Sequence, residues 1–394
     1  MRLLYLQQML ILPGQAGNGR SWDLVQRWTA LGHHITIVTS ASCLPPDHPW
    51  RRESFPLHKT KDGVGLIIFA GDYQHQYSFP RRVWAFWRFY RQLWRYRKRF
   101  PSIDTILAYS APLSVIWAGK RLAEYLGKPL FLELGDVWPE VPIGMGLIRP
   151  GWLRNWLHRK TDAVYRRASG IFPFSDDMAR QVEARGVAPK QIYVSYNGVD
   201  PARFPRHAKT PTRKLIYTGT FGLANGLSQL IEALAWVRDT YGQEISCDLV
   251  GSGNEEALLK ALAQEKQLQQ LKFLPAVSKE AIPAHLAGAQ IGISCFAPFP
   301  VLQTNSATKF YEYLAAGLPV ILNYGGWQAG YLRSHDCGLA VPQGDIQAFG
   351  QAIYELSQDE RRCAEMGTRA RQLALAHFDR QKLAAEMMDK MKVN

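Results

Sequence analysis

A lysine and a glutamate stand three residues apart in TNSATKFYEYLAAGLPVIL, residues 304–322. We expect a helix here, capped by Asn305 or Ser306 and ended by the Gly-Leu-Pro sequence that follows. Free N–H groups at a helix start attract anions, and Lys309 in the first turn adds a full positive charge. Glu312 lies on the same face, about 4.5 Å further along the axis.

The two oxygens of a glutamate can accept hydrogen bonds from vicinal hydroxyls. A diphosphate followed by a ribose has the layout of this Lys–Glu pair, so the motif predicts a nucleotide site. The alternative is an amphipathic helix that carries a solvated Lys–Glu pair.

A second candidate ligand loop lies near the start of the chain. Gly17, Asn18 and Gly19 precede an expected helix, where their backbone amides could reach a phosphate or an acceptor, or simply form a tight turn. Arg20 begins that helix. A cation there opposes the helix dipole unless an anion lies nearby, which favours a ligand contact.

A second glycine-rich turn, LVGSGNE, follows a predicted strand in the second half of the chain. We expect Gly251 and Gly253 to form the turn that lines the nucleotide base. Ser252 and Asn254 are then within reach of that base.

These motifs are set among strand-like and helix-like stretches that alternate along the chain. The expected strands are 3–12, 33–40, 63–70, 103–110, 129–134, 170–175, 191–199, 214–219, 245–251, 271–275, 291–296, 319–323 and 338–341. The expected helices are 21–32, 80–100, 112–126, 151–169, 176–186, 226–240, 254–266, 279–287, the helix of the opening motif and further helices to the end. The alternation predicts an α/β fold with parallel sheets and helices on both faces.

The stretch PARFPRHAKTPTR, residues 201–213, is rich in proline and basic residues and is the best linker. We predict two Rossmann-like, doubly wound parallel-sheet domains, residues 1–204 and 205–375, that face each other across a cleft. Ligands of such sheets bind beyond the carboxyl ends of the strands. A C-terminal helix at 376–394 is expected to pack back toward the N-terminal domain.

The composition is that of a globular protein with an uneven charge. Of its 394 residues 47% are hydrophobic and 20% charged, which argues against disorder. The net charge is +14. Residues 1–205 hold 28 Lys and Arg against 15 Asp and Glu, whereas the remainder holds 19 against 18. We therefore expect the N-terminal half to bind an anionic partner, which could be a membrane surface, an acidic substrate or nucleic acid.

The five cysteines are widely spaced, odd in number and without a C-x-x-C pair, which favours a reducing compartment over a disulfide framework or zinc site. Gln7 and Gln8 interrupt the apolar run at the start of the chain, so we expect a buried strand there and not a signal peptide. No apolar run approaches the roughly 18 residues that cross a bilayer.

Residues 79–100 carry eight Arg and Lys and no acid. At helical spacing one stripe is basic and the opposite side apolar, which is typical of an interfacial helix on an anionic membrane. The basic stripe is Arg88, Arg91, Arg95 and Lys98, and the apolar side is Val83, Phe86, Trp87, Tyr90, Leu93 and Trp94. We expect Trp87, Arg91, Trp94 and Arg95 to contact the membrane. The alternatives are packing on its own domain and nucleic-acid binding, for which no recognition motif is present.

Several stretches, spread over nearly the whole chain, come in the order of a known family. From the N-terminus they are GNGRSWDLVQRWTALGHHITIVTS, FSDDMARQVEARGVAPKQIYVSYNGVD, IYTGTFGLANGLSQLIEAL, DLVGSGNEEALLKALA and TKFYEYLAAGLPVIL. The family that they resemble is the retaining glycosyltransferases of family 4, which have the GT-B fold. ELGDVWPE, GTFGLANGL and SATKFYEYLAAGLPV are similar to the WbuB-like branch. Members of that branch add an amino sugar, typically N-acetyl-L-fucosamine, to a lipid-linked oligosaccharide precursor of bacterial surface polysaccharides.

The resemblance implies roles for individual residues. In ELGDVWPE, which includes Glu133, it places Asp136 and Glu140 at the donor sugar and acceptor. In a retaining transfer the leaving phosphate can accept the acceptor's proton, so Asp136 stabilises positive charge on the sugar or orients the hydroxyl. Glu140 could instead be an acid at a helix start. The donor-binding residues implied by the resemblance or by the motifs are Gly17, Asn18, Gly19, Arg20, Gly219, Thr220, Asn225, Gly251, Gly253, Ser306, Lys309 and Glu312.

The chain also departs from the family. Thr304 occupies the first position of the usual Glu-x7-Glu, and Thr220 and Asn225 occupy the positions of the usual phosphate-binding Arg and Lys. We expect Lys309 and Arg20 to replace those cations. In the family the first Glu normally contacts the transferred sugar, so its absence leaves the identity of that sugar undetermined.

The predicted protein is a retaining glycosyltransferase that moves an N-acetylated hexosamine or deoxyhexosamine from a UDP-sugar to a polyprenyl-diphosphate-linked saccharide. The product would serve O-antigen, capsule or exopolysaccharide synthesis, with the enzyme attached peripherally to the cytoplasmic face of the plasma membrane. We expect no cofactor and no nucleic-acid partner. We also expect no metal ion, because the sequence has no D-x-D motif to hold a metal at the diphosphate. The alternatives are another GT-B enzyme, such as a sugar-nucleotide epimerase, or a non-catalytic basic protein that binds membranes or nucleic acid.

Overall fold

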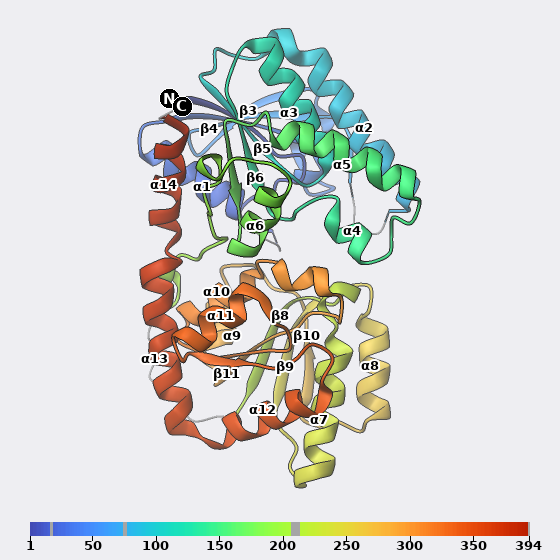
Figure 1. Cartoon of the computed structure of the whole chain (residues 1–394), viewed down its shortest axis with the longest axis vertical. Helices are drawn as coiled ribbons and strands as arrows, with labels where there is room; N and C mark the ends of the chain where they lie inside the picture. The colour runs from blue at the N-terminus through green and yellow to red at the C-terminus, as the bar shows by residue number, and fades with distance from the viewer. Residues whose placement is uncertain (16–18, 74–76, 206–212, 393–394) are drawn as a thin grey trace. The chain divides into compact units, whose positions relative to one another are not determined.

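The computed structural model describes residues 1–15, 19–73, 77–205 and 213–392, which form two α/β units (Figure 1). Unit 1 comprises residues 1–196 and the end of the chain from Gln381, and unit 2 comprises residues 197–380. The chain therefore leaves unit 1 earlier than the predicted boundary at residue 204. The reason lies in the backbone: the Val199 N–H donates to the Phe378 carbonyl at 2.9 Å, and the Arg380 N–H donates to the Val199 carbonyl at 2.8 Å, which ties both ends of unit 2 together.

Unit 1 is built on a seven-stranded sheet in the order β3-β4-β2-β1-β5-β6-β7. Its strands are β1 (Arg2–Leu6), β2 (His34–Ser40), β3 (Leu57–Lys61), β4 (Val64–Phe69), β5 (Thr105–Tyr109), β6 (Leu130–Leu134) and β7 (Gly170–Pro173). All neighbours pair in parallel except β3, which is antiparallel to β4. Leu4 lies in register between Thr36 and Ile106. Helices cover both faces of the sheet, so the central strands read as apolar runs without alternation.

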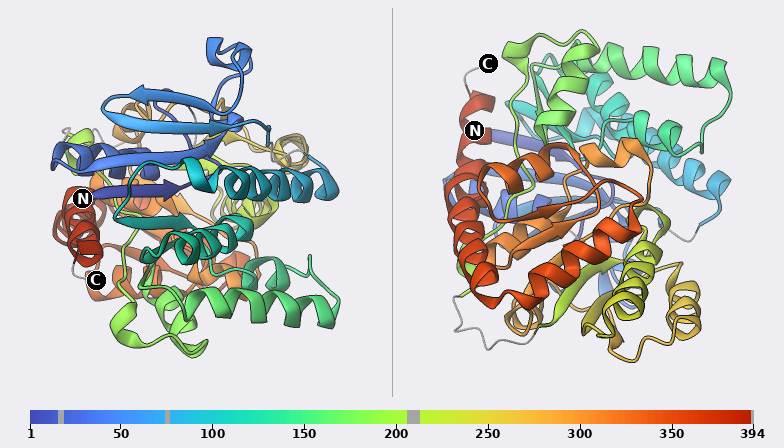
Figure 2. Two further views of the ribbon diagram at one scale, coloured as in Figure 1. Left: turned by 90° about the horizontal axis from the view of Figure 1, so that it is seen from above. Right: turned by 60° about the horizontal axis from the view of Figure 1, so that its bottom comes forward.

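The helices of unit 1 are α1 (Arg20–Ala30), α2 (Phe79–Tyr96), α3 (Leu113–Leu126), α4 (Glu140–Gly144), α5 (Gly151–Tyr165), α6 (Asp176–Ala184) and α14 (Arg380–Lys392). Core side chains of α2, α3, α5 and α6 pack on one face of the sheet, and those of α1 and α14 pack on the other. Figures 1 and 2 show α2, α3 and α5 side by side. Each of these three helices returns the chain from the carboxyl edge of the parallel sheet, so all three begin at that edge.

Unit 2 has an all-parallel sheet in the order β10-β9-β8-β11-β12-β13. Its strands are β8 (Leu215–Thr220), β9 (Cys247–Ser252), β10 (Leu271–Leu274), β11 (Ile291–Ser294), β12 (Val320–Leu322) and β13 (Gly338–Ala340). Its helices are α7 (Leu227–Tyr241), α8 (Glu256–Glu265), α9 (Ile282–Ala287), α10 (Thr308–Ala315), α11 (Gly326–Ser334), α12 (Ile346–Gln358) and α13 (Glu360–His377). The predicted α/β class with two parallel-sheet domains is confirmed, while the cleft between them stays a prediction.

Two predicted strands differ from the structure. The first strand ends at Leu6 and not at residue 12, because the Gln7 amide donates to the Ser21 hydroxyl at 3.0 Å and the Gln8 amide donates to the Ala85 carbonyl at 3.3 Å. The predicted strand at 191–199 is wrong. It makes only two isolated bridges, at Ile192 and at Val199, and the chain turns between them at Gly198, whose φ is +64°.

Strand β3 and helix α11 were not predicted, since both are short and polar in part. The five cysteines are buried and free. Of the helices in the described residues, none combines the length and the apolar content that a membrane crossing needs.

Candidate functional site

Helix α10 begins at the carboxyl edge of the unit 2 sheet without a side-chain cap. Its N-cap is Ala307, so the prediction that Asn305 or Ser306 caps it is wrong. The Ser306 hydroxyl is within hydrogen-bond distance of the Tyr311 hydroxyl, at 2.6 Å, and the buried Oδ1 atom of Asn305 has no partner among the described residues. Among the described residues no side chain therefore caps the first amides of α10, which leaves them able to donate to an anion.

Lys309 points back to the end of β8. It is 8% exposed, and its Nζ atom lies 3.4 Å from the Asn225 Oδ1 atom and 4.7 Å from the centre of the Tyr217 ring. Burial lowers the pKa of Lys309 to about 8. A buried ammonium with a neutral amide and a ring as neighbours is poorly compensated, which is the condition that favours binding of an anion.

Glu312 is the second buried charge on α10. It is 7% exposed, and none of the described residues donates a hydrogen bond to its carboxylate. Burial raises the pKa of Glu312, against the opposing influence of nearby cations that include Arg380 and Lys309. The carboxylate therefore retains acceptor capacity for ligand hydroxyls.

Glycines bring the loops beside Lys309 close together. A Cβ at Gly251 would lie 1.8 Å from the Gly219 carbonyl oxygen, and one at Gly253 would lie 2.2 Å from the Phe221 carbonyl oxygen. Gly219 has φ +145°, and a Cβ there would approach the Lys309 Cε atom to 3.1 Å. These glycines thus permit the contact of the β8 and β9 ends. The base-lining role of Gly251 and Gly253 stays a prediction.

Thr220 and Asn225, which replace the usual phosphate-binding Arg and Lys of the family, lie around the end of β8. Thr220 is exposed, and its carbonyl accepts from the Tyr217 hydroxyl at 3.0 Å. Asn225 ends a short 3₁₀ turn, η6 (Leu223–Asn225), and contacts Lys309. Lys309 thus contacts Asn225 at one of these two positions, and it lies beside Gly219, which directly precedes Thr220 at the other.

In unit 1, Arg20 has its anion within the same unit. Its Nε atom donates to the Glu133 carboxylate at 2.7 Å, with both side chains almost fully buried. The other guanidinium nitrogens donate to the Tyr196 carbonyl at 2.7 Å and to the Ser195 hydroxyl at 2.9 Å. The Tyr5 hydroxyl also donates to Glu133. The start of α1 therefore does not need a ligand to compensate the charge of Arg20, because Glu133 supplies the anion.

The candidate loop before Arg20 is described only in part. Gly17 and Asn18 lie outside the described residues. Gly19 is the N-cap of α1, has φ −77° and would accept a Cβ without a contact to any described residue, so none of these neighbours requires glycine there.

Asp136 follows β6 at the carboxyl edge of the unit 1 sheet. It is half-buried, and burial raises the pKa of its carboxyl to about 7. Its backbone carbonyl accepts from the Ser110 hydroxyl at 3.3 Å, which fixes the loop. A carboxyl group that titrates near neutral pH at the end of a strand is suited to chemistry.

Glu140 is the first residue of α4, where an acid stabilises the helix dipole. Its carboxylate lies 3.5 Å from His158 and 3.8 Å from Arg185. These contacts favour the helix-start interpretation of Glu140, while its predicted catalytic role has no contact that supports it.

Several residues of the unit 2 site were missed by sequence reasoning. Tyr217 lies beside Lys309, and the Tyr313 hydroxyl accepts from the Thr218 N–H at 2.8 Å. Arg380, 1% exposed, donates to the Gly198 carbonyl at 2.6 Å and contributes positive potential at Glu312. These residues come from distant parts of the chain, so no spacing signal could have joined them.

The basic helix α2 is only partly as predicted. Leu93 is buried in the core together with Phe89, whereas Trp87, Arg91 and Arg95 are exposed. Trp94 is half-buried between two guanidinium groups, at 3.9 Å from Arg121 and 4.5 Å from Arg97. The alternative that part of the aromatic face packs on its own domain is thus correct for these residues.

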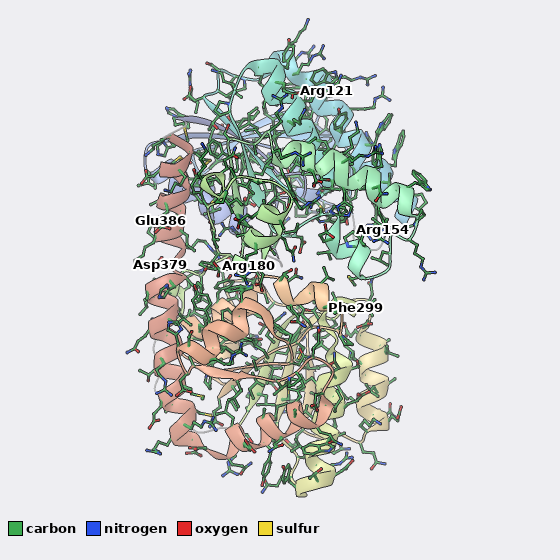
Figure 3. All side chains as sticks on the ribbon, in the orientation of Figure 1. Arg121, Arg154, Arg180, Phe299, Asp379 and Glu386 are labelled. Carbon is green, nitrogen blue, oxygen red and sulfur yellow. The ribbon has the colours of Figure 1, made fainter. Side chains whose placement is uncertain are left out.

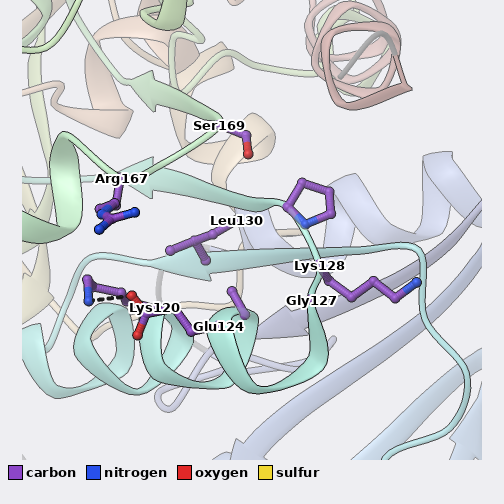
Figure 4. Close-up of a pocket in the computed structure, with 9 residues that line it drawn as sticks. Lys120, Glu124, Gly127, Lys128, Leu130, Arg167 and Ser169 are labelled. Carbon is purple, nitrogen blue, oxygen red and sulfur yellow. Dashed lines mark hydrogen bonds and ion pairs between the residues drawn. The ribbon is translucent and has the colours of Figure 1, made fainter.

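A cavity of about 270 Å³ lies at the opposite, amino edge of the unit 1 sheet (Figure 4). Lys120, Glu124, Lys128 and Arg167 contribute its charged lining, and the first two form an ion pair at 2.7 Å. It is at the edge of the unit 1 sheet opposite to the one that carries Asp136, so we assign it no part in the chemistry.

Comparison with known proteins agrees with this arrangement. Residues 20–203 match the family described as Glycosyltransferase Family 4, and residues 199–373 match Glycosyl transferases group 1. The chain is 24% identical over 298 residues to WcaI of Escherichia coli (strain K12), a glycosyl transferase assigned to colanic acid biosynthesis, which covers 70% of this chain and 72% of WcaI. It is 26% identical over 305 residues to a GDP-mannose-dependent alpha-(1-6)-phosphatidylinositol monomannoside mannosyltransferase of Mycobacterium tuberculosis, which covers 73% and 75%.

Solved structures share the fold at low identity. The sucrose-phosphate synthase of Thermosynechococcus elongatus superposes with a TM-score of 0.80 and 16% identity, covering 100% of this chain and 98% of that one. Anabaena Alr3699/HepE, solved in complex with UDP, superposes with a TM-score of 0.72 and 17% identity over the full length of both chains. With the two family matches adjoining one another from residue 20 to residue 373 and the fold shared throughout, the chain belongs to the GT-B glycosyltransferases, with a family 4 N-terminal domain and a group 1 C-terminal domain.

Proposed function

We propose that this glycosyltransferase moves an N-acetylated hexosamine or deoxyhexosamine from a UDP-sugar to a polyprenyl-diphosphate-linked saccharide, with retention of the anomeric configuration. The reaction would extend a lipid-linked precursor of a bacterial surface polysaccharide, as in the WbuB-like branch that the chain resembles. The relative WcaI is named for colanic acid biosynthesis, which is consistent with this proposal.

The observation that supports it most is the state of Lys309 and Glu312. Both are buried within one turn of the uncapped start of α10, and among the described residues no ion pair joins them to each other. Burying charges without close partners is unfavourable in the free protein. A bound nucleoside diphosphate supplies what each group lacks: phosphate oxygens for Lys309 and the helix amides, and ribose hydroxyls for Glu312.

The same residues explain how the leaving group is stabilised. As the bond between the sugar and the diphosphate breaks, negative charge grows on the phosphate oxygens. Lys309 and the α10 amides stabilise this charge. The acceptor hydroxyl passes its proton to the leaving phosphate as it attacks from the same face. Asp136, in its ionised form, stabilises the positive charge that develops on the sugar.

The nucleotide is the part of this proposal that the relatives leave most open. HepE was solved with UDP, whereas the mycobacterial mannosyltransferase is named as GDP-mannose-dependent. We retain UDP because the resemblance to the WbuB-like branch implies it. Competition between UDP and GDP for the site tests this choice directly.

The deciding experiment is calorimetric titration of the full chain with UDP and with GDP, repeated on Glu312→Ala and on the exposed control Glu265→Ala in α8. We expect saturable UDP binding that Glu312→Ala weakens by at least about tenfold, since a hydrogen-bonded pair of hydroxyls is lost. The control should bind as the unchanged protein does. Absence of saturable binding to either nucleotide would favour the alternative of a non-catalytic basic protein.

Transfer itself is read by mass spectrometry, with a panel of UDP-sugars and a polyprenyl-diphosphate-GlcNAc acceptor. Proton NMR of the product reports the anomeric configuration. An inverted product would contradict the mechanism even if transfer occurs, and epimerised donor without transfer would favour the epimerase alternative.

The lipid-linked acceptor leads us to propose peripheral attachment to the inner face of the plasma membrane. The exposed Trp87, Arg91 and Arg95 of α2 and the positive charge of the N-terminal half support this proposal. Trp94 packs against Arg97 and Arg121 and is half-buried, and its contact with the membrane stays a prediction.

A further inference from the structure

Unit 1 exposes large apolar side chains at two places that are far apart in the sequence. On α2 these are Val83, Trp84 and Trp87, which are 47%, 59% and 43% exposed. On α5 and the segment that leads into it they are Leu147, Trp152 and Trp156, which are 69%, 73% and 40% exposed. We call the first group the α2 tip and the second group the α5 tip.

The fold brings the helices that carry the two tips to the same face of the unit 1 sheet, on either side of α3. Trp156 of α5 packs edge-on against Trp117 of α3, with 5.5 Å between ring centres, and Arg121 of α3 donates to the Tyr90 hydroxyl of α2 at 3.1 Å. Figures 1 and 2 show the three helices side by side. In Figure 3, Arg154 lies near the start of α5, at the end of that face away from Arg121.

Both tips belong to the N-terminal halves of their helices, or directly precede them. Helices on a parallel sheet begin at its carboxyl edge, so the α2 tip and the α5 tip lie toward the same edge as Asp136. A surface that docks there would bring its lipid-borne groups to the edge at which we place the acceptor.

The charge around the two tips is of one sign. Residues 73–103 and 141–161 contain no Asp or Glu. Arg88 and Arg91 flank the α2 tip, and Arg149 and Arg154 flank the α5 tip. In the described part of the chain no carboxylate forms an ion pair with any of these four arginines. Arg91 instead lies 4.4 Å from the centre of the Trp87 ring.

We propose that the α2 tip and the α5 tip together form one membrane-docking face, in which Leu147, Trp152 and the neighbouring Arg149 and Arg154 are a second contact as important as the basic helix α2. The occupant is the surface of an anionic phospholipid bilayer. Tryptophan and leucine enter the region between headgroups and acyl chains, while the arginines bind lipid phosphates. This inference rests on the proposed function, because a lipid-linked acceptor requires the enzyme at a membrane.

A protein partner fits these observations less well. Interfaces between proteins bury a continuous apolar centre with depleted charge, whereas here the exposed aromatic side chains are interspersed with arginines that form no ion pair in the described part of the chain. Two separate tips of this kind are suited to a fluid surface that adapts to both. A single amphipathic helix would also leave the unit free to rotate about that helix, whereas two contacts fix its orientation.

The test is flotation of the full chain with vesicles of phosphatidylcholine and of phosphatidylcholine with 30% phosphatidylglycerol. Leu147→Ser with Trp152→Ser removes the α5 tip, and Trp84→Ser with Trp87→Ser removes part of the α2 tip. These residues are exposed, so the core is not disturbed. We expect each pair of changes to lower partitioning into anionic vesicles by about tenfold. Leu31→Ser with Leu258→Ser, which are 50% and 63% exposed elsewhere, is the matched control and should stay within about twofold.

A second measurement addresses the charge. Arg149→Glu with Arg154→Glu should lower binding to anionic vesicles by at least about tenfold and leave the weak binding to neutral vesicles unchanged. Raising the salt to about 1 M, where the screening length is about 3 Å, should reduce the difference between the two vesicle types.

Three results would overturn the inference. Unchanged flotation of the Leu147→Ser, Trp152→Ser protein, with loss only in the α2 variant, would leave α2 as the anchor. Equal binding to neutral and anionic vesicles would remove the role of the arginines. A dimer in sedimentation that dissociates on the same substitutions would identify the face as a contact between copies of this chain. UDP binding, measured on every variant, reports the proposed function separately, since neither tip includes a residue of the α10 site.

Discussion

At the carboxyl edge of the unit 1 sheet, the buried guanidinium of Arg20 lies 2.7 Å from the buried carboxylate of Glu133, and backbone and hydroxyl oxygens take its remaining N–H groups. At the corresponding edge of unit 2, Lys309 and Glu312 are buried without an ion pair between them in the described residues. Burial of charge is unfavourable in both cases. The first unit offsets it with protein groups, whereas in the second unit we propose that a bound nucleotide offsets it.

The largest expected effect is a loss of stability on substitution of Glu133, which tests whether the buried ion pair is structural. Glu133→Gln leaves the Arg20 guanidinium buried without an anion, and removing one partner of a buried pair typically destabilises by about 3–5 kcal/mol. Urea unfolding followed by circular dichroism measures the change. Adding Arg20→Gln to the same protein should restore part of the lost stability. A loss below about 1 kcal/mol for the single change would show that the pair is not essential to unit 1.

Lys309→Met makes the opposite test in unit 2. The side chain keeps its approximate length but loses a charge whose pKa burial has already lowered, so we expect no loss of thermal stability in the free protein. The stabilisation of the leaving diphosphate is lost, and kcat/KM should fall by about 10²–10³-fold. Parallel melting curves and transfer assays check both statements. A marked destabilisation with normal transfer would make Lys309 structural, like Arg20.

The pH profile sharpens the comparison further. Burial raises the pKa of Asp136 to about 7 and lowers the pKa of Lys309 to about 8. The carboxylate is needed in its ionised form and the lysine in its charged form, so kcat/KM of the free enzyme should fall about tenfold per unit below pH 7 and above pH 8. Lys309→Arg should remove the alkaline fall, because arginine stays protonated. A flat profile from pH 6 to 9 would contradict both assignments.

The smallest expected effect concerns the stability of unit 1. Because burial raises the pKa of Asp136, the ionised form is disfavoured in the folded protein, and stability should decline as pH rises from the ordinary aspartate pKa toward 7. Asp136→Asn removes this penalty, so the melting temperature at pH 8 should rise by about 2–4 °C. The gain should vanish at pH 4, where the native residue is also neutral. A lower melting temperature at pH 8 would show that Asp136 stabilises the fold.

The fold was predictable because its signals are local. The apolar run of β1 and the alternation of strands and helices each depend on a few neighbouring residues. The failures have identified causes. Residues 191–199 have a strand-like composition, but only isolated bridges form there. Ser306 resembles a helix cap, yet its hydroxyl contacts Tyr311. In both cases the hydrogen bonds of the folded chain differ from those that residue type alone favours.

The sequence by itself determined the two-domain α/β class, the resemblance to family 4 and the placement of Lys309 and Glu312 one turn apart on one helix, since each depends on residues near one another along the chain. Only the tertiary structure decided which charges are compensated. Glu133 reaches Arg20 across 113 positions, and Asn225 reaches Lys309 across 84. The tertiary structure also brought the exposed tryptophans of α2 and α5 to one face. The physical reason is that charge compensation and surface exposure depend on distances in space, which spacing along the chain does not specify.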